Sequence, residues 1–258
     1  SNIDSTPSPA EMNMLQKYMN VLNSVDALKF EGQDYSVFDL VDSNHIDMTK
    51  ITMEVKTITT DEMNNRTENI GIYDANGEQT LNTTRTLVNG EWHEAVADVT
   101  STGEGDDKIT TFTYRDGSEI VSYDNEEMKI QDMTTAVTKF DAKGNMIYSD
   151  MRTDYGRSVT ENTYNDKNEL THTTTTQTII REGQEDETHV LDASVTRENG
   201  VTRYTYSEES ESVSVVDGEI KIQDMGTAVL DYDKHGNLLR SDMRTDYGRS
   251  VTENTYND

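Results

Sequence analysis

Oxygen-bearing side chains surround a glycine in one short segment of the chain, at a spacing that suits a hard cation. Asp74, Asn76 and Glu78 lie around Gly77, and Ca²⁺ prefers several carboxylate and amide oxygens at once. The segment lacks the further ligand and the late bidentate glutamate of a complete calcium loop. The chain contains 50 Asp and Glu residues, so partial matches of this kind arise from composition. The sequence therefore predicts weak, diffuse calcium binding and no other cofactor.

A second polar pattern occurs twice and indicates recognition rather than catalysis. In each copy an arginine stands between two aspartates at alternate positions, which places three side chains on one face of an expected strand. The copies comprise Asp150, Arg152 and Asp154, and Asp242, Arg244 and Asp246. One interpretation is a polar surface repeated along the molecule for a repeating ligand. The other is a solvated charge ladder between strands that adds little to stability.

The five histidines follow no HExxH or other paired-ligand spacing. When the chain is aligned with itself at an offset of 92 residues, three of them face other residue types: His172, His189 and His235 lie opposite Thr80, Ala97 and Lys143. This alignment predicts that no histidine belongs to a repeated site. The chain also lacks a phosphate-binding loop, a G-x-S-x-G elbow and a dinucleotide fingerprint. We therefore expect a protein without catalytic residues, with a hydrolase that uses paired acids as the remaining alternative.

The balance of charges excludes several classes of partner. The chain has 22 Lys and Arg against 50 Asp and Glu, a formal net charge of −28. Such a surface repels phosphate backbones and anionic headgroups, so nucleic acid is not an expected partner. No apolar run approaches the roughly 20 residues that span a bilayer. The absence of cysteine removes disulfides and thiolate chemistry and leaves the compartment open.

Strands must position these side chains. The chain contains 36 Thr and 13 Tyr, and no proline follows residue 9, a balance that favours strands. In residues 50–57, Ile51, Met53 and Val55 alternate with polar residues, as expected of a half-buried strand. Turn pairs such as Asn89-Gly90 and Asn199-Gly200 recur about every 8 to 14 residues. These features predict a mainly β fold of antiparallel meander sheets.

The N-terminal region departs from this pattern. Residues 1–8 are small and polar, as in a linker or in the stub that follows a removed signal or lipid-attachment segment. Ser8, Pro9 and Glu11 form a helix-start signal. Apolar residues then recur at helical spacing: Met12, Leu15, Met19, Leu22 and Val25. The sequence therefore predicts one amphipathic helix over residues 9–28.

Internal repetition is the strongest signal in the chain. Residues 149–166 and 241–258 are the same 18 residues, and 29 of 39 positions are identical when the comparison starts at residues 128 and 220. A worn earlier copy shares the T-D and T-E-N spacing of these blocks. Repetition at a fixed period predicts repeated strand order and register. We expect a tandem 92-residue β unit, with a partial unit over residues 29–74 and full units over residues 75–166 and 167–258.

Four short segments share an aromatic residue followed by Asp or Asn, beginning at Tyr73, Phe140, Tyr164 and Tyr232. With the T-D-Y-G-R and T-Y-N-D segments that follow, they resemble the YD-repeat (Rhs-type) pattern of bacterial surface and toxin-shell proteins. The best match covers residues 140–171, and residues 232–258 match as far as they go. The 92-residue unit is longer than a single YD repeat, and Asn168 stands where the turn glycine is expected. The resemblance implies secretion, a β-rich shell or stalk, and no catalysis by the repeats.

The order of a helix followed by long amphipathic strands is similar to half-barrel lipoprotein carriers of the bacterial envelope. In that family a helix closes a curved sheet whose concave face holds an apolar ligand. The resemblance implies a ligand site lined by Met12, Leu15, Met19, Leu22 and Met53. The alternative is that the methionines fill gaps in a thin core.

Taken together, the sequence predicts a non-catalytic, exported β-repeat protein of a bacterial surface or envelope, with a structural or adhesive binding role. Its partner would be a surface protein or carbohydrate. The alternative is a soluble half-barrel carrier that binds a lipid-like ligand between the helix and the sheet. We do not expect the chain to span a membrane, although an anchor on a removed N-terminal segment fits the composition of residues 1–8.

Overall fold

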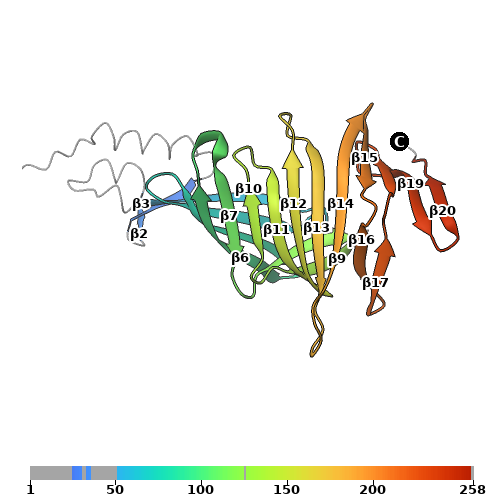
Figure 1. The fold of residues 1–258 in the computed structure, drawn as a ribbon. Helices are drawn as coiled ribbons and strands as arrows, with labels where there is room; N and C mark the ends of the chain where they lie inside the picture. Colours follow the sequence, from blue (N-terminus) through green and yellow to red (C-terminus); the bar gives the residue numbers. More distant parts are fainter. Residues whose placement is uncertain (1–24, 31–32, 36–50, 125, 257–258) are drawn as a thin grey trace, which may run out of the picture. The chain divides into compact units, whose positions relative to one another are not determined.

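The computed structural model describes residues 25–30, 33–35, 51–124 and 126–256, and these form antiparallel strands joined by short turns (Figure 1). The predicted mainly β, antiparallel class is confirmed. Within these ranges the helical residues are one short 3₁₀ turn, Gly105–Asp107. No helix among them is long and apolar enough to cross a membrane.

The chain divides into two compact units. The first comprises residues 1–104 and 110–135, and the second comprises residues 105–109 and 136–258. Each unit contains a meander in which most strands pair with their neighbours in the sequence, and each carries one separate two-stranded hairpin. The exceptions are β3, which pairs with β1, and β18, which pairs with β15.

In the first unit the meander runs β2-β1-β3-β4-β5-β6 and continues into β7. The strands are β1 (Val25–Phe30), β2 (Gln33–Tyr35), β3 (Ile51–Thr60), β4 (Arg66–Tyr73), β5 (Gln79–Val88), β6 (Glu91–Thr102) and β7 (Ile109–Tyr114). The separate hairpin is formed by β8 (Glu119–Asp124) and β9 (Glu127–Asp132).

In the second unit the meander runs β10-β11-β12-β13-β14-β15-β18-β19-β20, and the hairpin β16-β17 leaves it between β15 and β18. The strands are β10 (Val137–Phe140), β11 (Met146–Thr153), β12 (Gly156–Tyr164), β13 (Leu170–Ile179), β14 (Glu187–Glu198), β15 (Val201–Tyr206), β16 (Glu211–Val216), β17 (Glu219–Asp224), β18 (Val229–Tyr232), β19 (Leu238–Thr245) and β20 (Gly248–Glu253).

Several strands recur with the same length at an offset of 92 residues. The pairs are β7 and β15, β8 and β16, β9 and β17, β10 and β18, and β11 and β19. The two copies of the 18-residue block also share the same hairpin register, since Arg152 faces Arg157 in one and Arg244 faces Arg249 in the other. Strands of equal length and, in the 18-residue block, the same hairpin register therefore recur at this offset.

The turn chemistry agrees with the sequence. Asn89 and Gly90 have φ values of 50° and 81°, and Asn199 and Gly200 have 51° and 78°. Two successive residues at positive φ give the tight reversal that matches the twist of antiparallel strands. The hairpins predicted at these pairs are confirmed.

Most buried apolar residues are Ala or Val, with a few larger ones such as Ile51, Met53 and Ile179. On β6 the buried positions alternate at Ala95, Ala97 and Val99, and on β14 they are Ala193 and Val195. Many other strand residues are half-buried, as along β5 and β13. Threonine-rich strands suit this arrangement because a β-branched side chain with a hydroxyl packs on the pleat and still bonds to water.

The predicted helix over residues 9–28 is wrong at its C-terminal end. Residues 9–24 lie outside the described residues, whereas Val25 starts the strand β1, which pairs with β3. The registers Val25 with Val55 and Leu28 with Met53 show the reason. Extended backbone there completes the ladder of β3, an interaction between distant residues that helical spacing does not reveal.

Candidate functional site

The segment considered for calcium forms the turn between β4 and β5. The Asp74 Oδ1 atom accepts the backbone N–H groups of Asn76 at 2.9 Å and Glu78 at 3.0 Å. The same arrangement, with amides two and four residues ahead, closes four further turns, at Asp61, Asp141, Asn165 and Asp233. The carboxylate thus closes its own turn. No group of three or more His, Cys, Asp or Glu side chains in the described ranges is placed to hold a metal ion.

The predicted polar stripes lie partly on strands. Asp150 and Arg152 belong to β11, and Asp154 follows in the turn before β12. The carboxylate of Asp150 accepts a hydrogen bond from the Arg157 side chain of the neighbouring strand. The first copy therefore joins two adjacent strands, and sequence reasoning missed the partner because it lies diagonally across the ladder.

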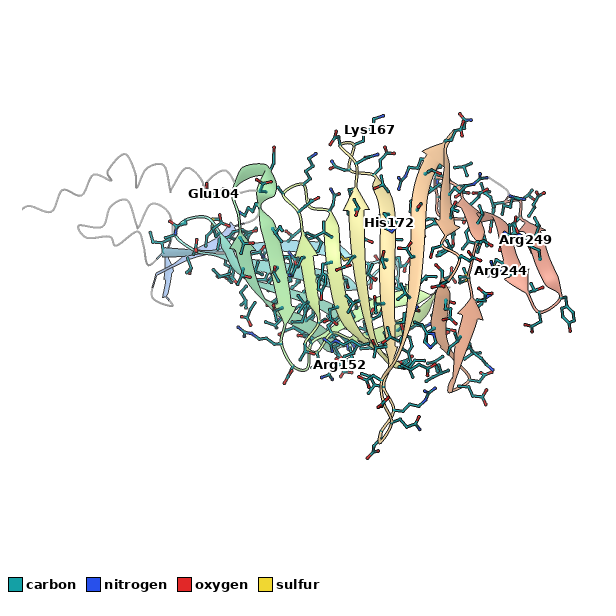
Figure 2. The ribbon with its side chains drawn as sticks, viewed as in Figure 1. Glu104, Arg152, Lys167, His172, Arg244 and Arg249 are labelled. Atoms are coloured by element: carbon teal, nitrogen blue, oxygen red, sulfur yellow. The ribbon has the colours of Figure 1, made fainter. Side chains whose placement is uncertain are left out.

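The second stripe follows the same plan and adds contacts. Asp242 and Arg244 belong to β19, Asp246 lies in the next turn, and Asp242 pairs with Arg249 at 2.7 Å. Arg249 also donates to the Thr227 hydroxyl and carbonyl oxygens, both at 3.0 Å. Figure 2 labels Arg244 and Arg249 on these last strands.

Arg244 lies near two acidic side chains of the hairpin region. Its guanidinium is 3.7 Å from Glu208 and 3.8 Å from Asp224. In both copies the first aspartate pairs with an arginine of the neighbouring strand, as the interpretation as a charge ladder between strands requires. The interpretation as a recognition surface stays a prediction.

The residues assigned to a carrier site fall into two groups. Met53 lies on β3 and is fully buried, with Leu28 and Tyr73 as its neighbours in the ladder. The remaining four, Met12, Leu15, Met19 and Leu22, lie outside the described residues.

A junction between a sheet strand and the separate hairpin occurs in the first unit. The Ser118 hydroxyl accepts the N–H of Val96 at 3.0 Å and donates to its carbonyl at 3.2 Å. Beside it, His93 Nδ1 lies 2.7 Å from Glu119 Oε1. These contacts attach the β8-β9 hairpin to β6.

The second unit contains the equivalent junction. The Ser210 hydroxyl bonds to the N–H of Asp192 at 3.1 Å and to its carbonyl at 3.0 Å. His189 Nδ1 lies 3.0 Å from Glu211 Oε1, and its Nε2 lies 2.8 Å from Glu187 Oε1. The hairpin β16-β17 is thereby attached to β14, the strand beside it in Figure 1.

The prediction that no histidine belongs to a repeated site is wrong. His93 and His189 are the third residues of β6 and β14, and each bonds to the first residue of its hairpin, Glu119 or Glu211. The offset is 92 residues for the glutamates but 96 for the histidines. A two-residue turn precedes β6, whereas residues 180–186 form the loop before β14. The loop after β14, residues 199–200, is in turn shorter than the loop after β6, residues 103–108, so the offset returns to 92 at β15. A gapless alignment at 92 therefore misplaces β14 by four residues.

The second junction has an additional buried element. Gln177 of β13 is 4% exposed, donates from Nε2 to the Glu211 carbonyl at 2.8 Å and accepts the N–H of Val213 at 2.7 Å. One side-chain amide thus satisfies a donor and an acceptor at the start of β16, and removal would leave both without a partner.

Charged groups in the junction have shifted pKa values. The hydrogen bond to Glu211 raises the pKa of His189 above its ordinary value of 6.5, burial opposes this, and Glu187 adds to the rise. The hydrogen bonds from His189 and Arg181 lower the pKa of Glu187. Each shift favours the ionised pair.

A buried carboxylate lies on β4. Glu68 is 2% exposed and contacts Arg66, Arg85 and Lys56, the last at 3.8 Å. Burial alone would raise the pKa of Glu68, but the hydrogen bonds from Arg85 and Arg66 outweigh it and hold that pKa below its ordinary value. An ionised carboxylate among three cations is a structural ion cluster and a poor proton donor.

A pocket of about 400 Å³ opens on the second unit. Its lining consists of Arg197, Thr202, Tyr204, Tyr206, Tyr232, Asp233, Lys234 and Gly236. The register places Arg197 beside Thr202 and Thr202 beside Tyr232, so one face of three neighbouring strands forms the wall. These residues come from β14, β15, β18 and the turn that follows β18.

Small buried residues make room for the tyrosine rings. Ala193 and Val195 of β14 lie beside Tyr206 and Tyr204 in the ladder. The rings of Tyr204 and Tyr232 meet edge to face, with centroids 5.6 Å apart and planes at 83°.

Ionisable groups in this pocket have distinct roles. The Asn237 backbone amide and further hydrogen bonds lower the pKa of Asp233, whose carboxylate closes its own turn. Burial raises the pKa of Tyr206 to about 12, so its hydroxyl stays protonated at neutral pH. Arg197 donates to the carbonyl of Leu170 at 2.7 Å, and the exposed Lys234 lies on the rim.

Comparisons with known proteins add no relationship to this picture: no protein-family model matches the chain, and no curated protein matches it. The function must therefore be inferred from the pocket and the junctions themselves.

Proposed function

We propose that this chain is a non-catalytic β-repeat protein of a bacterial surface or envelope, with a structural and adhesive binding role. The observation that supports it best is the open tyrosine-lined pocket on the sheet of the second unit. An aromatic pocket with a few convergent polar groups is a common form of ligand site. Its arginine, its threonine and its three tyrosines lie on strands, which hold side chains more rigidly than loops do.

The repeated elements support the structural part of this proposal. Strands of equal length at a 92-residue offset, and hairpin junctions built from the same Ser, His and Glu types, are what a tandem 92-residue unit requires. We infer that such a unit, whose copies were predicted over residues 75–166 and 167–258, forms the scaffold. The resemblance to YD-repeat surface proteins agrees with this role.

The chemistry of the polar groups supports a non-catalytic role. His93 and His189 join strands to hairpins, and His172 joins β13 to β14 through Asp192. Of the acidic groups with lowered pKa values, Asp233 closes its own turn and Asp231 pairs with Arg203. Groups engaged in this way stabilise the fold.

Two measurements test the proposal. Protease treatment of intact cells of the source bacterium should remove the chain while a cytoplasmic marker survives. Beads coated with the purified full chain should be retained on cell-surface polysaccharide, and uncoated beads should not. Protection of the chain in intact cells together with absence of bead retention would contradict the proposal.

A further inference from the structure

We propose that the tyrosine pocket of the second unit binds a carbohydrate that carries a carboxylate, such as a uronic acid within a polysaccharide. This inference rests on the proposed adhesive function and names the ligand class. The occupant must match three features of the wall: ring faces, neutral hydroxyls and an excess of positive charge.

The ring faces come from Tyr204, Tyr206 and Tyr232, all half-buried. A pyranose has an apolar C–H face and a rim of hydroxyls, so it can lie against an aromatic ring while its edge is hydrogen-bonded. The volume of about 400 Å³ falls within the range of small-ligand sites, roughly 300 to 1,000 Å³.

The hydrogen-bonding groups lie beside these rings. The phenol of Tyr206 stays protonated at neutral pH, and the Thr202 hydroxyl lies on the same wall. Both groups donate and accept, as sugar hydroxyls do. The Asp233 carboxylate is already engaged by the amides of His235 and Asn237, so it holds the turn in place.

The charge of the wall selects an acidic sugar. Arg197 and Lys234 supply two positive charges against the one negative charge of Asp233, in a chain whose net charge is −28. Within the described residues the Lys234 ammonium has no ion-pair partner. Arg197 uses one donor on the Leu170 carbonyl, and its Nε lies 3.9 Å from the Glu169 carboxylate, so Lys234 is the main cation available to a ligand. Arg197 lies beside Thr202, and Lys234 follows two residues after Tyr232, so the two cations share one end of the wall.

Isothermal titration of the purified full chain with two probes tests this inference. The probes are a galacturonate trisaccharide and a hyaluronan tetrasaccharide, each compared with its carboxyl-reduced form at about 50 mM salt. We expect at least one acidic probe to bind roughly tenfold more tightly than its reduced form, and this preference should shrink at about 0.5 M salt because the cations are exposed.

Matched variants locate the site. Tyr204→Ala should weaken binding about tenfold or more, and Lys234→Met should abolish the preference for the acidic form. Tyr204→Phe keeps the ring and should retain most of the affinity. Lys143→Met lies in the equivalent turn closed by Asp141, and Tyr247→Ala removes a fully exposed ring outside the pocket. Both should bind as the unaltered chain does, and circular dichroism verifies that each variant is folded.

The outcomes separate this inference from the proposed function. Equal binding of acidic and reduced probes, unchanged binding by Tyr204→Ala, or no binding of any probe overturns the inference. If beads are nevertheless retained on cell-surface polysaccharide, the adhesive role stands and its site lies elsewhere. If both binding assays are negative and the chain is protected in intact cells, both proposals fail.

Discussion

Strands β12 and β20 begin with the same residues but have different surroundings. Both follow an identical hairpin, and each pairs with the preceding strand in the same register. β12 is also covered by β13 along its other edge, and its residues are largely half-buried. In the described structure β20 pairs with β19 alone, all of its residues are exposed, and it ends at Glu253, whereas β12 continues to Tyr164. The residues of the hairpin therefore determine its register, whereas pairing with a further strand determines how buried and how long its second strand is.

The largest difference in the effect of a substitution on stability is expected at the first residue of β12 and β20. A Cβ atom at Gly156 would meet the Thr178 carbonyl oxygen and lie 2.9 Å from the Ile180 nitrogen, whereas Gly248 has no atom within 4 Å. Their φ values are +149° and +122°, so alanine is strained at both. Gly156→Ala should lower the free energy of unfolding by about 3 kcal/mol or more, and Gly248→Ala by about 1 kcal/mol.

Chemical denaturation of the two variants measures this contrast. Equal losses would show that β13 does not constrain β12 as closely as the structure indicates.

The next difference in stability concerns Gln177 on β13, the strand that pairs with the outer edge of β12. Gln177→Ala should destabilise the chain by about 2 to 3 kcal/mol, because one buried backbone donor and one acceptor lose their partner. The matched change is Thr86→Ala on β5, where a buried hydroxyl lies 3.3 Å from the hydroxyl of Thr67, and about 1 kcal/mol is expected there. Thermal unfolding measures both, and a smaller effect for Gln177 would contradict the role given to its amide.

The contribution of His189 to stability should be smaller and should depend on pH. Because Glu211 and Glu187 raise the pKa of His189, the charged pair stabilises the fold fully below the ordinary histidine value of 6.5, and this stability is lost as pH rises through the higher folded value. After screening at the half-exposed glutamates, His189→Gln should cost about 0.5 to 1 kcal/mol at pH 6 and less at pH 9.

Melting temperatures of the unaltered chain and of His189→Gln at the two pH values provide the test. Glu211→Gln serves as the control, since it removes the main cause of the shift and should abolish most of the difference. A larger loss at pH 9 than at pH 6 would contradict the assignment.

The smallest difference in stability is expected between the aspartate–arginine ion pairs of the two copies of the 18-residue block. The Asp150 pair with Arg157 and the Asp242 pair with Arg249 are partly exposed, with arginine exposures of 33% and 46%. Asp150→Asn should cost about 0.5 kcal/mol and Asp242→Asn less, because solvent screens the more exposed pair. Urea unfolding of both variants would refute this order if Asp242→Asn proved the more destabilising.

Local chemistry allowed much of the fold to be predicted. The positive φ values of Asn-Gly pairs depend on neighbouring residues only, and the structure has hairpins at these pairs. The alternation of apolar and polar residues along residues 50–57 is also local, and the structure has the strand β3 there. The strand β1 could not be predicted in the same way, because Val25 continues an apparent helical spacing and its extended conformation comes from pairing with Val55.

The candidate site was predicted less completely. The pocket combines Tyr204 and Tyr206 of β15 with Tyr232 and Arg197 of two other strands, and only the pairing register of these strands brings them together. The histidine junctions were missed because the loops on both sides of β14 differ in length from those around β6, the first being longer and the second shorter. Allowing a gap in the self-alignment would have set His189 opposite His93.

The central claim is that this chain binds its ligand through the tyrosine pocket. Side-chain NMR of the purified chain with ¹³C-labelled tyrosine rings, titrated with the acidic oligosaccharides, tests it most directly. The account predicts that among the 13 tyrosines the resonances of Tyr204, Tyr206 and Tyr232 shift with a common affinity, while that of the exposed Tyr247 does not. Shifts confined to tyrosines outside the pocket, or none at saturating probe, would contradict the claim.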